Sequence, residues 1–228
     1  MNEFWKFPHT PHLLWLGTGE ARGDKVLSTQ EVDKILSRKL IVEEKVDGAN
    51  LGISVDSSGE FRFQNRGSYL EKPYRGQFSR LASWFSGHQY ELVKSITPNL
   101  ILFGEWCAAK HSLSYDRLND WFLLFDVYSK VERAFWDTVR RDQFAYVTGL
   151  STTPRVAEGF FDRNNLVSLL MSSESKFRHG SVEGLIIKAE ANGFCEMRAK
   201  IVRPDFVQQI NEHWSARRLE WNRVESDT

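Results

Sequence analysis

Short apolar runs and amphipathic stretches alternate along the chain, and their periods predict a series of strands and helices. Continuous or alternating apolar positions predict strands at residues 40–44, 50–55, 61–64, 100–106, 121–128, 183–188 and 196–201. Apolar positions at helical spacing predict helices at residues 30–38, 76–95, 132–146 and 164–172. Helices that separate strands in this way predict an α+β fold with a mostly antiparallel sheet.

Local signals mark the beginning of two helices. Ser28-Thr-Gln-Glu31 has the pattern of a capping box and predicts the start of the first helix. Pro204 suits the first turn of a final helix. Apolar residues then recur at helical spacing, at Val207, Ile210, Trp214 and Trp221. We expect this C-terminal helix to pack on the domain.

The composition is typical of a folded, aromatic-rich globule, with 41% apolar residues that include 16 Phe and 8 Trp. No apolar run reaches the length of about 18 residues that a membrane-spanning helix needs. The N-terminus lacks the basic and apolar regions of a signal peptide. Two cysteines, Cys107 and Cys195, do not form a disulfide framework, so we expect a reducing, cytoplasmic location.

The charge balance argues against broad, nonspecific binding to nucleic acid. The chain has 30 basic and 30 acidic residues, which leaves no net charge. A local basic groove is still compatible with this balance, because residues 176–203 contain more basic than acidic side chains.

The candidate chemistry begins with the segment Lys45-Val-Asp-Gly-Ala-Asn50, which follows the predicted strand 40–44. This placement presents an amine beside a carboxylate and a glycine turn, as a nucleophile for the α-phosphate of a nucleotide requires. Taken alone, Lys45 is more typical of a surface lysine beside a β-turn. The interpretation therefore depends on partners elsewhere in the chain.

Five further motifs follow in a fixed order, namely Asn65-Arg-Gly67, Phe103-Gly-Glu-Trp106, Leu123-Leu-Phe-Asp126, Glu183-Gly-Leu-Ile-Ile-Lys188 and Arg198-Ala-Lys200. Together with Lys45 they resemble the covalent nucleotidyltransferase superfamily, and most closely its RNA ligase 2-like group, over residues 39–203. Asn50 matches RNA ligases, whereas DNA ligases and capping enzymes usually have Arg there. The resemblance implies an ATP-grasp-like nucleotidyltransferase domain with antiparallel sheets that line a nucleotide cleft.

Lys45 is the nucleophile that this resemblance implies. The reaction needs an unprotonated amine, although free lysine has a pKa of about 10.4. We expect burial and nearby cations to lower the pKa of Lys45, and the candidate cations are Arg66, Lys188 and Lys200. Lys188 and Lys200 also count as catalytic, because the resemblance places them against the α-phosphate; ordinary charges at a sheet edge are the alternative.

The resemblance also implies contacts to the nucleotide. Glu105 would bind the ribose hydroxyls, and Phe125 would stack on the purine, although a core position suits Phe125 as well. Glu44 would accept a hydrogen bond from the adenine amino group or remain an exposed strand carboxylate. The full set that we expect to contact the nucleotide is Glu44, Lys45, Asn50, Arg66, Glu105, Phe125, Lys188, Arg198 and Lys200. Arg198 stands where the group commonly has lysine.

Three acidic residues are candidate metal ligands. Glu183 is the strongest, because Mg²⁺ takes few carboxylates and completes its shell with water and phosphate oxygens. Asp47 would hold a metal-bound water or stabilise its turn. Asp126 would hold either the metal site or its own loop. We expect ATP and Mg²⁺ as the nucleotide and metal, with Mn²⁺ as an alternative metal.

These observations predict an ATP-dependent RNA ligase that joins 5′-phosphate and 3′-hydroxyl ends through lysyl-AMP and 5′-adenylylated RNA. The alternatives are a GTP-dependent capping-type guanylyltransferase and a noncatalytic nucleotide- or nucleic-acid-binding module. The expected partner is RNA, with DNA as an alternative strand. Only 28 residues follow Lys200, so we expect residues 1–228 to form one minimal, monomeric domain without an OB-fold or other C-terminal domain. A partner protein that grips the substrate is the alternative to self-sufficiency.

Overall fold

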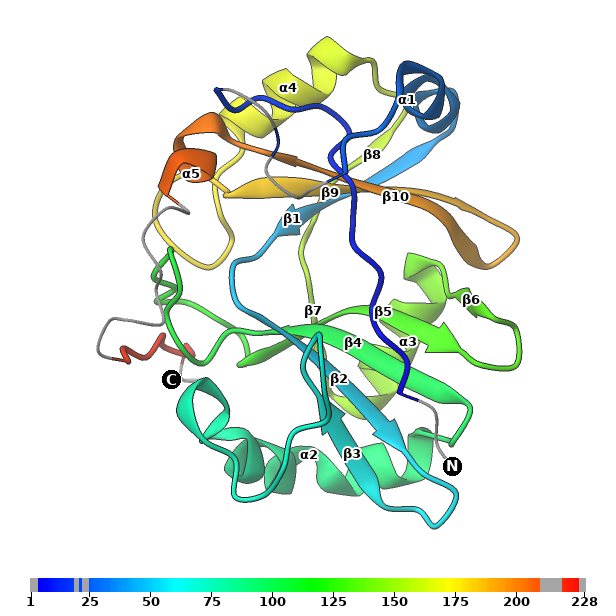
Figure 1. Cartoon of the computed structure of the whole chain (residues 1–228), viewed down its shortest axis with the longest axis vertical. Helices are drawn as coiled ribbons and strands as arrows, with labels where there is room; N and C mark the ends of the chain where they lie inside the picture. The colour runs from blue at the N-terminus through cyan, green and yellow to red at the C-terminus, as the bar shows by residue number, and fades with distance from the viewer. Residues whose placement is uncertain (1–3, 19–20, 22–24, 210–218, 226–228) are drawn as a thin grey trace.

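The computed structural model describes residues 4–18, 21, 25–209 and 219–225, and two β-sheets that face each other form its centre (Figure 1). Helices cover the outer side of each sheet, as the separate hydrophobic cores on the two outer faces show. This arrangement confirms the predicted α+β fold with antiparallel sheets. None of the helices in the described ranges is long and apolar enough to cross a membrane.

The first sheet has the strand order β10-β9-β1-β8, and all its neighbouring strands are antiparallel. Its strands are β1 (Leu40–Lys45), β8 (Arg155–Gly159), β9 (Gly184–Ala191) and β10 (Phe194–Val202). Two helices pack on its outer face, α1 (Thr29–Leu36) and α4 (Arg163–Ser172). A short helix, α5 (Pro204–Gln209), follows β10.

The second sheet has the order β3-β2-β4-β5-β6, and β7 adds to β5 in parallel. Its strands are β2 (Ala49–Val55), β3 (Phe61–Gln64), β4 (Leu100–Trp106), β5 (Phe122–Ser129), β6 (Ala134–Phe135) and β7 (Ser151–Thr152). The helices α2 (Leu81–Ser95) and α3 (Thr138–Thr148) contribute to the core on its outer face. A single 3₁₀ turn, η1 (Gly76–Phe78), precedes α2.

The alternation of side chains along β1 explains how one strand serves both a core and a site. Leu40 and Val42 are fully buried in the core beneath α1 and α4. Because successive residues of a strand point to opposite faces, Glu43 and Lys45 point to the other face, between the two sheets. The alternation of side chains along β1 therefore places Glu43 and Lys45 on the face of the first sheet that is turned toward the second sheet.

The N-terminal segment joins the two sheets. Trp5 and Phe7 pack on aromatic residues of the second sheet, including Phe103 at ring-centroid distances of 5.6 and 5.0 Å. Farther along, the backbone N–H of Leu13 donates to the carbonyl of Lys200 in β10 at 2.7 Å. The segment therefore runs from the second sheet to the first, across the gap between them (Figure 1).

Most of the predicted elements are confirmed, and the capping box at Ser28 forms both of its hydrogen bonds. The predicted helix 132–146 is wrong at its start, because residues 134–135 form β6 and Asp137 caps α3. The strands β7 and β8 were not predicted, because neither is long enough or apolar enough to show a clear period.

The predicted C-terminal helix is confirmed only in part. The helix α5 begins at Pro204, as predicted. Trp221, however, forms an extended bridge with Ala109, so the prediction that it continues the helix is wrong. Its apolar spacing reflects packing against the second sheet, where Trp221 contacts the core. Ile210 and Trp214 lie outside the described residues.

Candidate nucleotide site

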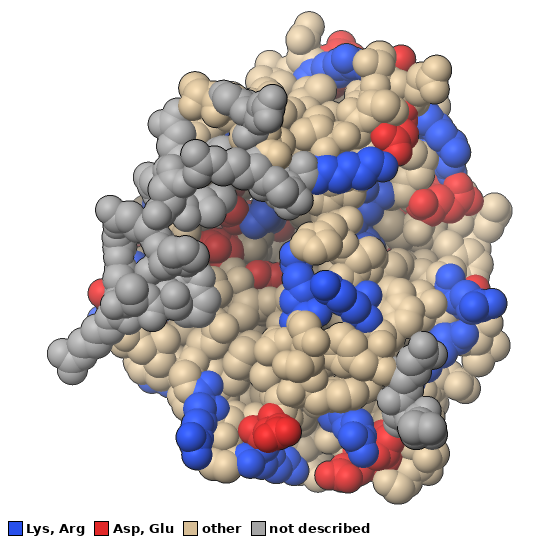
Figure 2. All heavy atoms as spheres, viewed as in Figure 1, with Lys and Arg blue, Asp and Glu red and all other residues tan. Residues whose placement is uncertain are grey.

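A cavity lies between the two sheets, and every residue that we predicted to contact the nucleotide lines it. Figure 2 shows this hollow, with basic and acidic side chains inside it. Eight further residues line the cavity, namely Phe7, His9, Thr10, Glu43, Val46, Asp126, Thr153 and Ile186. The sheets thus bring together motifs that lie more than a hundred residues apart in the chain.

Lys45 and Glu183 form a close ion pair beside this cavity. The Lys45 Nζ donates to both carboxylate oxygens of Glu183, at 2.8 and 2.7 Å. The pairing of strands explains the contact, because Lys45 ends β1 directly opposite Gly184, the first residue of β9. Little of either side chain is exposed, 24% for Lys45 and 11% for Glu183.

The expectation that cations lower the pKa of Lys45 is wrong for the protein without nucleotide. Burial by itself would lower this pKa, but the charges of Glu183, Asp47 and Glu105 raise it above its ordinary value. Lys200 instead affects the pKa of Glu183. Burial raises this pKa, and the positive charge of Lys200 lowers it. The carboxylates around Lys45 therefore favour its protonated form.

Two glycines allow this geometry. A Cβ added to Gly184 would lie 2.5 Å from the carbonyl oxygen of Ile201 and 3.3 Å from Cδ of Lys45. A Cβ added to Gly48 would lie 2.7 Å from the carbonyl oxygen of Trp106. Both distances to oxygen are too short for any side chain. The glycines next to Glu183 and Asp47 thus let β9 and β4 approach the lysine closely.

Glu105 and Asn50 face each other on neighbouring strands, β4 and β2. Burial, together with the charges of Asp47 and Glu183, raises the pKa of Glu105 to about 7, against the lowering effect of Lys45. The Oδ1 atom of Asn50 is buried and accepts no hydrogen bond from the described residues. A buried acceptor without a donor fits a ligand that brings hydroxyl or amino groups into the cavity.

The raised pKa of Glu105 predicts a pH-dependent effect on stability. Between its unfolded pKa of about 4.5 and its folded pKa of about 7, the folded protein holds a proton that the unfolded chain has lost. Stability contributed by this group is therefore lost as pH rises through that window. Glu105→Gln should raise the free energy of unfolding by roughly 2–3 kcal/mol at about pH 8 and by little at about pH 4.

Chemical denaturation at both pH values measures this difference. Glu71→Gln is the matched control, because Glu71 is exposed and its substitution should change the free energy of unfolding by little. An equal change for Glu105→Gln at the two pH values would contradict the raised pKa.

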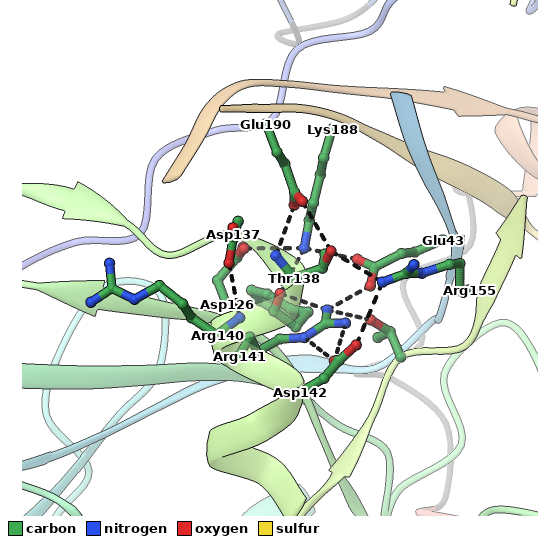
Figure 3. Close-up of polar contacts among 12 residues, drawn as sticks. Glu43, Asp126, Asp137, Thr138, Arg140, Arg141, Asp142, Arg155, Lys188 and Glu190 are labelled. Carbon is green, nitrogen blue, oxygen red and sulfur yellow. Dashed lines mark hydrogen bonds and ion pairs between the residues drawn. The ribbon is translucent and has the colours of Figure 1, made fainter. Parts of the chain in front are cut away.

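A network of buried charges at the wall of the cavity connects the two sheets (Figure 3). Lys188 is almost fully buried, and its Nζ lies 2.8 Å from Glu43, 3.2 Å from Asp126 and 2.7 Å from the carbonyl oxygen of Phe125, to which it donates. Arg198 pairs with the other oxygen of Asp126 at 2.7 Å. Lys188 and Arg198 already balance the negative charge of Asp126. These contacts favour the alternative in which Asp126 holds its own loop over the one in which it binds a metal.

Arg141 of α3 extends this network from the far side. It forms ion pairs with Glu43 and with Asp142, the latter at 2.6 Å, and it donates to the carbonyl of Phe125 at 3.1 Å. Both Arg141 and Glu43 are almost fully buried. A buried ion pair of this kind adds little net stability but fixes geometry, since removal of one partner leaves an uncompensated charge.

Phe125 has one side in the aromatic core and one side on the cavity. Its ring meets Phe7 edge to face, with centroids 5.2 Å apart, and its carbonyl accepts from both Lys188 and Arg141. Ile186, from the first sheet, also lines the cavity. An aromatic ring from one sheet and an aliphatic side chain from the other suit the two faces of a base.

Glu44 and Asp47 are already engaged by the protein. The Glu44 carboxylate accepts from the Ser175 hydroxyl at 2.5 Å and from the Lys176 N–H at 2.9 Å, so an adenine amino group would compete with both donors. Asp47 accepts from the backbone N–H groups of residues 112 and 113, at 2.7 and 3.0 Å. These bonds support the turn-stabilising role of Asp47.

Arg66 lies at the exposed rim of the cavity, with its Nη1 3.5 Å from the His9 ring. The candidate metal ligands do not form a cage: among the described residues, no three His, Cys, Asp or Glu side chains are grouped to hold an ion. Glu183 still fits Mg²⁺, because this ion keeps several waters and binds through one or two carboxylates together with substrate phosphates.

Sequence reasoning missed Glu43, Arg141 and Phe7. The period of two in β1 contained a signal for Glu43, since it shares a face with Lys45. No such signal exists for Arg141 or Phe7, because their positions depend on how α3 and the N-terminal segment pack.

The fold and the site together define a nucleotidyltransferase domain of the ligase type. Residues 38–202 match the model of the RNA ligase family, described as "RNA ligase". This match covers most of the chain, and the chain therefore belongs to the RNA ligase family. No curated protein sequence matches the chain.

Several solved structures share the fold. A Naegleria gruberi RNA ligase with PPi matches with a TM-score of 0.61 and 16% identity, over 90% of this chain and 64% of that one. A variant of that ligase with ATP and Mn gives 0.60 and 13% over the same shares. An archaeal ATP-dependent RNA ligase gives 0.55 and 17%, over 91% of this chain and 50% of that one. The chain thus spans half to two-thirds of the length of these structures.

Proposed function

We propose that this chain is an ATP-dependent RNA ligase that joins a 5′-phosphate end to a 3′-hydroxyl end. The observation that carries the proposal is the Lys45–Glu183 ion pair, beside a cavity that combines an apolar slot with buried polar and charged groups. Structures that share this fold include an RNA ligase with PPi and a variant with ATP and Mn, which supports ATP as the nucleotide.

In the first step, the Nζ of Lys45 loses a proton and attacks the α-phosphorus of ATP. A P–N bond forms, the α–β phosphoanhydride bond breaks, and pyrophosphate leaves. Glu183 and phosphate oxygens would hold Mg²⁺ or Mn²⁺. This ion would offset the negative charge of the phosphates. Once Glu183 no longer pairs with Lys45, the largest of the effects that raise the pKa of Lys45 is lost, and burial acts to lower that pKa toward the neutral amine.

The cavity supplies alignment for this step. Phe125 and Ile186 would hold the base, and Glu105 and Asn50 would accept hydrogen bonds from the ribose or orient the phosphate. Lys200 and Arg66 would face the negative phosphates, which leaves Lys188 and Arg198 to hold Asp126 and Glu43 in place. Phosphoryl transfer depends mainly on such positioning and electrostatic stabilisation.

In the second step, an oxygen of the RNA 5′-phosphate attacks the phosphorus of lysyl-AMP, and the P–N bond breaks. This gives 5′-adenylylated RNA and returns Lys45 as an amine. In the third step, the 3′-hydroxyl attacks the RNA phosphorus, loses its proton and displaces AMP. Residues 1–228 would carry out these steps as one domain, with the substrate RNA as partner.

The third step gives a direct test. Pre-adenylylated RNA already carries the leaving group, so wild type and Lys45→Ala should both join it to a 3′-hydroxyl strand without ATP. Joining should weaken as the salt concentration rises, because basic side chains such as Arg66 and Lys200 would bind the phosphates of the RNA. The assay should include single-stranded, nicked and splinted substrates, measured by gel electrophoresis. A wild-type protein that adenylylates itself but joins none of these ends would contradict the ligase function.

A further inference from the structure

The described C-terminal segment, residues 219–225, packs against the loop formed by residues 107–118. The backbone bonds between them include Asn222 N–H to the Ala108 carbonyl, and Arg223 N–H to the Tyr115 carbonyl, both at 2.9 Å. This segment lies outside residues 38–202, which match the family model. Its contacts therefore join a segment outside the matched residues to a loop within them.

Asn222 holds this loop from the inside. The side chain is buried, with 3% exposed, and three hydrogen bonds satisfy it. Its Nδ2 donates to the carbonyls of Cys107 and Ala109, at 2.8 and 3.2 Å, and its Oδ1 accepts from the Tyr115 N–H at 2.8 Å. A fully satisfied buried amide of this kind imposes one conformation on the backbone around it.

Tyr115 transmits this constraint to the lysine motif. Its ring is buried, with 1% exposed, in a cluster that also contains Val46, and its hydroxyl accepts from the Asp47 N–H at 2.8 Å. The same loop donates two N–H groups to the Asp47 carboxylate. The peptide plane between Val46 and Asp47 is thus fixed directly after Lys45.

We propose that Tyr115 and Asn222 are positioning residues for Lys45. The C-terminal segment holds the 107–118 loop, the loop fixes the backbone at Asp47, and this fixes the direction in which the Lys45 side chain leaves β1. The inference rests on the proposed function, since its readout is attack by Lys45 on ATP. Neither residue touches the reacting atoms, so both act through the backbone that carries the nucleophile.

Tyr115→Phe is the decisive variant, because it removes one hydroxyl and keeps the buried ring. The rate of lysyl-AMP formation at saturating ATP should fall about fivefold to tenfold, as expected for one lost hydrogen bond in the aligned state. The ATP concentration for half-maximal rate should change less than about twofold, because the nucleotide contacts remain. Joining of pre-adenylylated RNA without ATP should remain at the wild-type rate, since Lys45 is not the attacking group there.

Tyr146→Phe is the matched control, because Tyr146 is 89% exposed and should leave every rate unchanged. An unchanged rate of lysyl-AMP formation in Tyr115→Phe would overturn the inference. An equal fall in the joining of pre-adenylylated RNA would also overturn it, because the defect would then be general. A wild-type protein without lysyl-AMP formation would instead refute the proposed function, so the two failures are distinguishable.

Asn222→Ala tests the connection to the C-terminal segment. If Asn222 acts through Tyr115, the double variant with Tyr115→Phe should be no slower than Asn222→Ala alone. Independent, multiplying losses would exclude the path through Tyr115. Should Asn222→Ala fail to fold, as shown by circular dichroism, the Tyr115→Phe result decides the inference by itself.

Discussion

A single AMP should add to the wild-type protein during incubation with ATP and Mg²⁺, and none should add to Lys45→Ala. The Lys45 amine lies beside the cavity within 2.8 Å of Glu183, and no alanine side chain can form the P–N bond. Intact-mass spectrometry measures the adduct, and peptide mapping locates it. Incubation with GTP in place of ATP separates the ligase from a capping-type guanylyltransferase, because only the latter should form lysyl-GMP.

Lys39→Ala is the control for this experiment. Lys39 lies just before β1, and its side chain is 61% exposed in a surface ion pair with Glu158. Its removal should leave the adduct at the wild-type level. An adduct that persists on another residue of Lys45→Ala would disprove the assignment of the nucleophile.

Glu183→Gln should reduce the rate of lysyl-AMP formation on the order of a hundredfold or more. The substitution removes the carboxylate charge that would hold the divalent metal, and this metal would stabilise the charge on the reacting phosphates. Glutamine fills the same space as glutamate. The melting temperature should therefore change by less than about 3 °C, because Lys45 can lose its proton in this variant and so leaves no uncompensated buried charge. Radiolabelled adduct formation and a thermal melt measure the two effects.

A second readout of Glu183→Gln does not depend on activity. The ion pair with Glu183 is the strongest interaction that raises the pKa of Lys45, so its loss should lower that pKa. Lys45 should then react faster with an acylating reagent at mildly alkaline pH. Glu196→Gln is the matched control, because Glu196 forms a 2.7 Å ion pair with Arg38 at the surface. A wild-type level of lysyl-AMP formation in Glu183→Gln would exclude the proposed role of Glu183 as a metal ligand.

Three of the four strands of the first sheet, β1, β9 and β10, could be predicted because their signals are local. The apolar run at residues 40–42 indicates β1, and a capping box fixes the start of α1. Lys45, Glu183 and Lys200 were found in the same way, because each belongs to a short motif at the end of a strand or within one. These signals depend only on neighbours in the chain, where sequence and geometry are directly related.

The electrostatics of the site could not be predicted in this way. The sequence led us to expect cations around Lys45, but the register of β1 against β9 places Glu183 next to it. The buried network of Glu43, Arg141 and Lys188 likewise depends on how α3 packs against two sheets. Charge interactions act through space, so their sign follows from tertiary distances and not from spacing along the chain.

The sequence by itself therefore determined the class of fold, the candidate nucleophile and the order of the motifs. Only the tertiary structure decided the protonation of Lys45, the partners of Lys188 and Asp126, and the contact of the C-terminal segment with the 107–118 loop. The signals for strands and helix caps lie within a few residues of each other. These contacts, by contrast, join segments that lie up to 138 residues apart in the chain. Their geometry exists only after the two sheets have packed against each other.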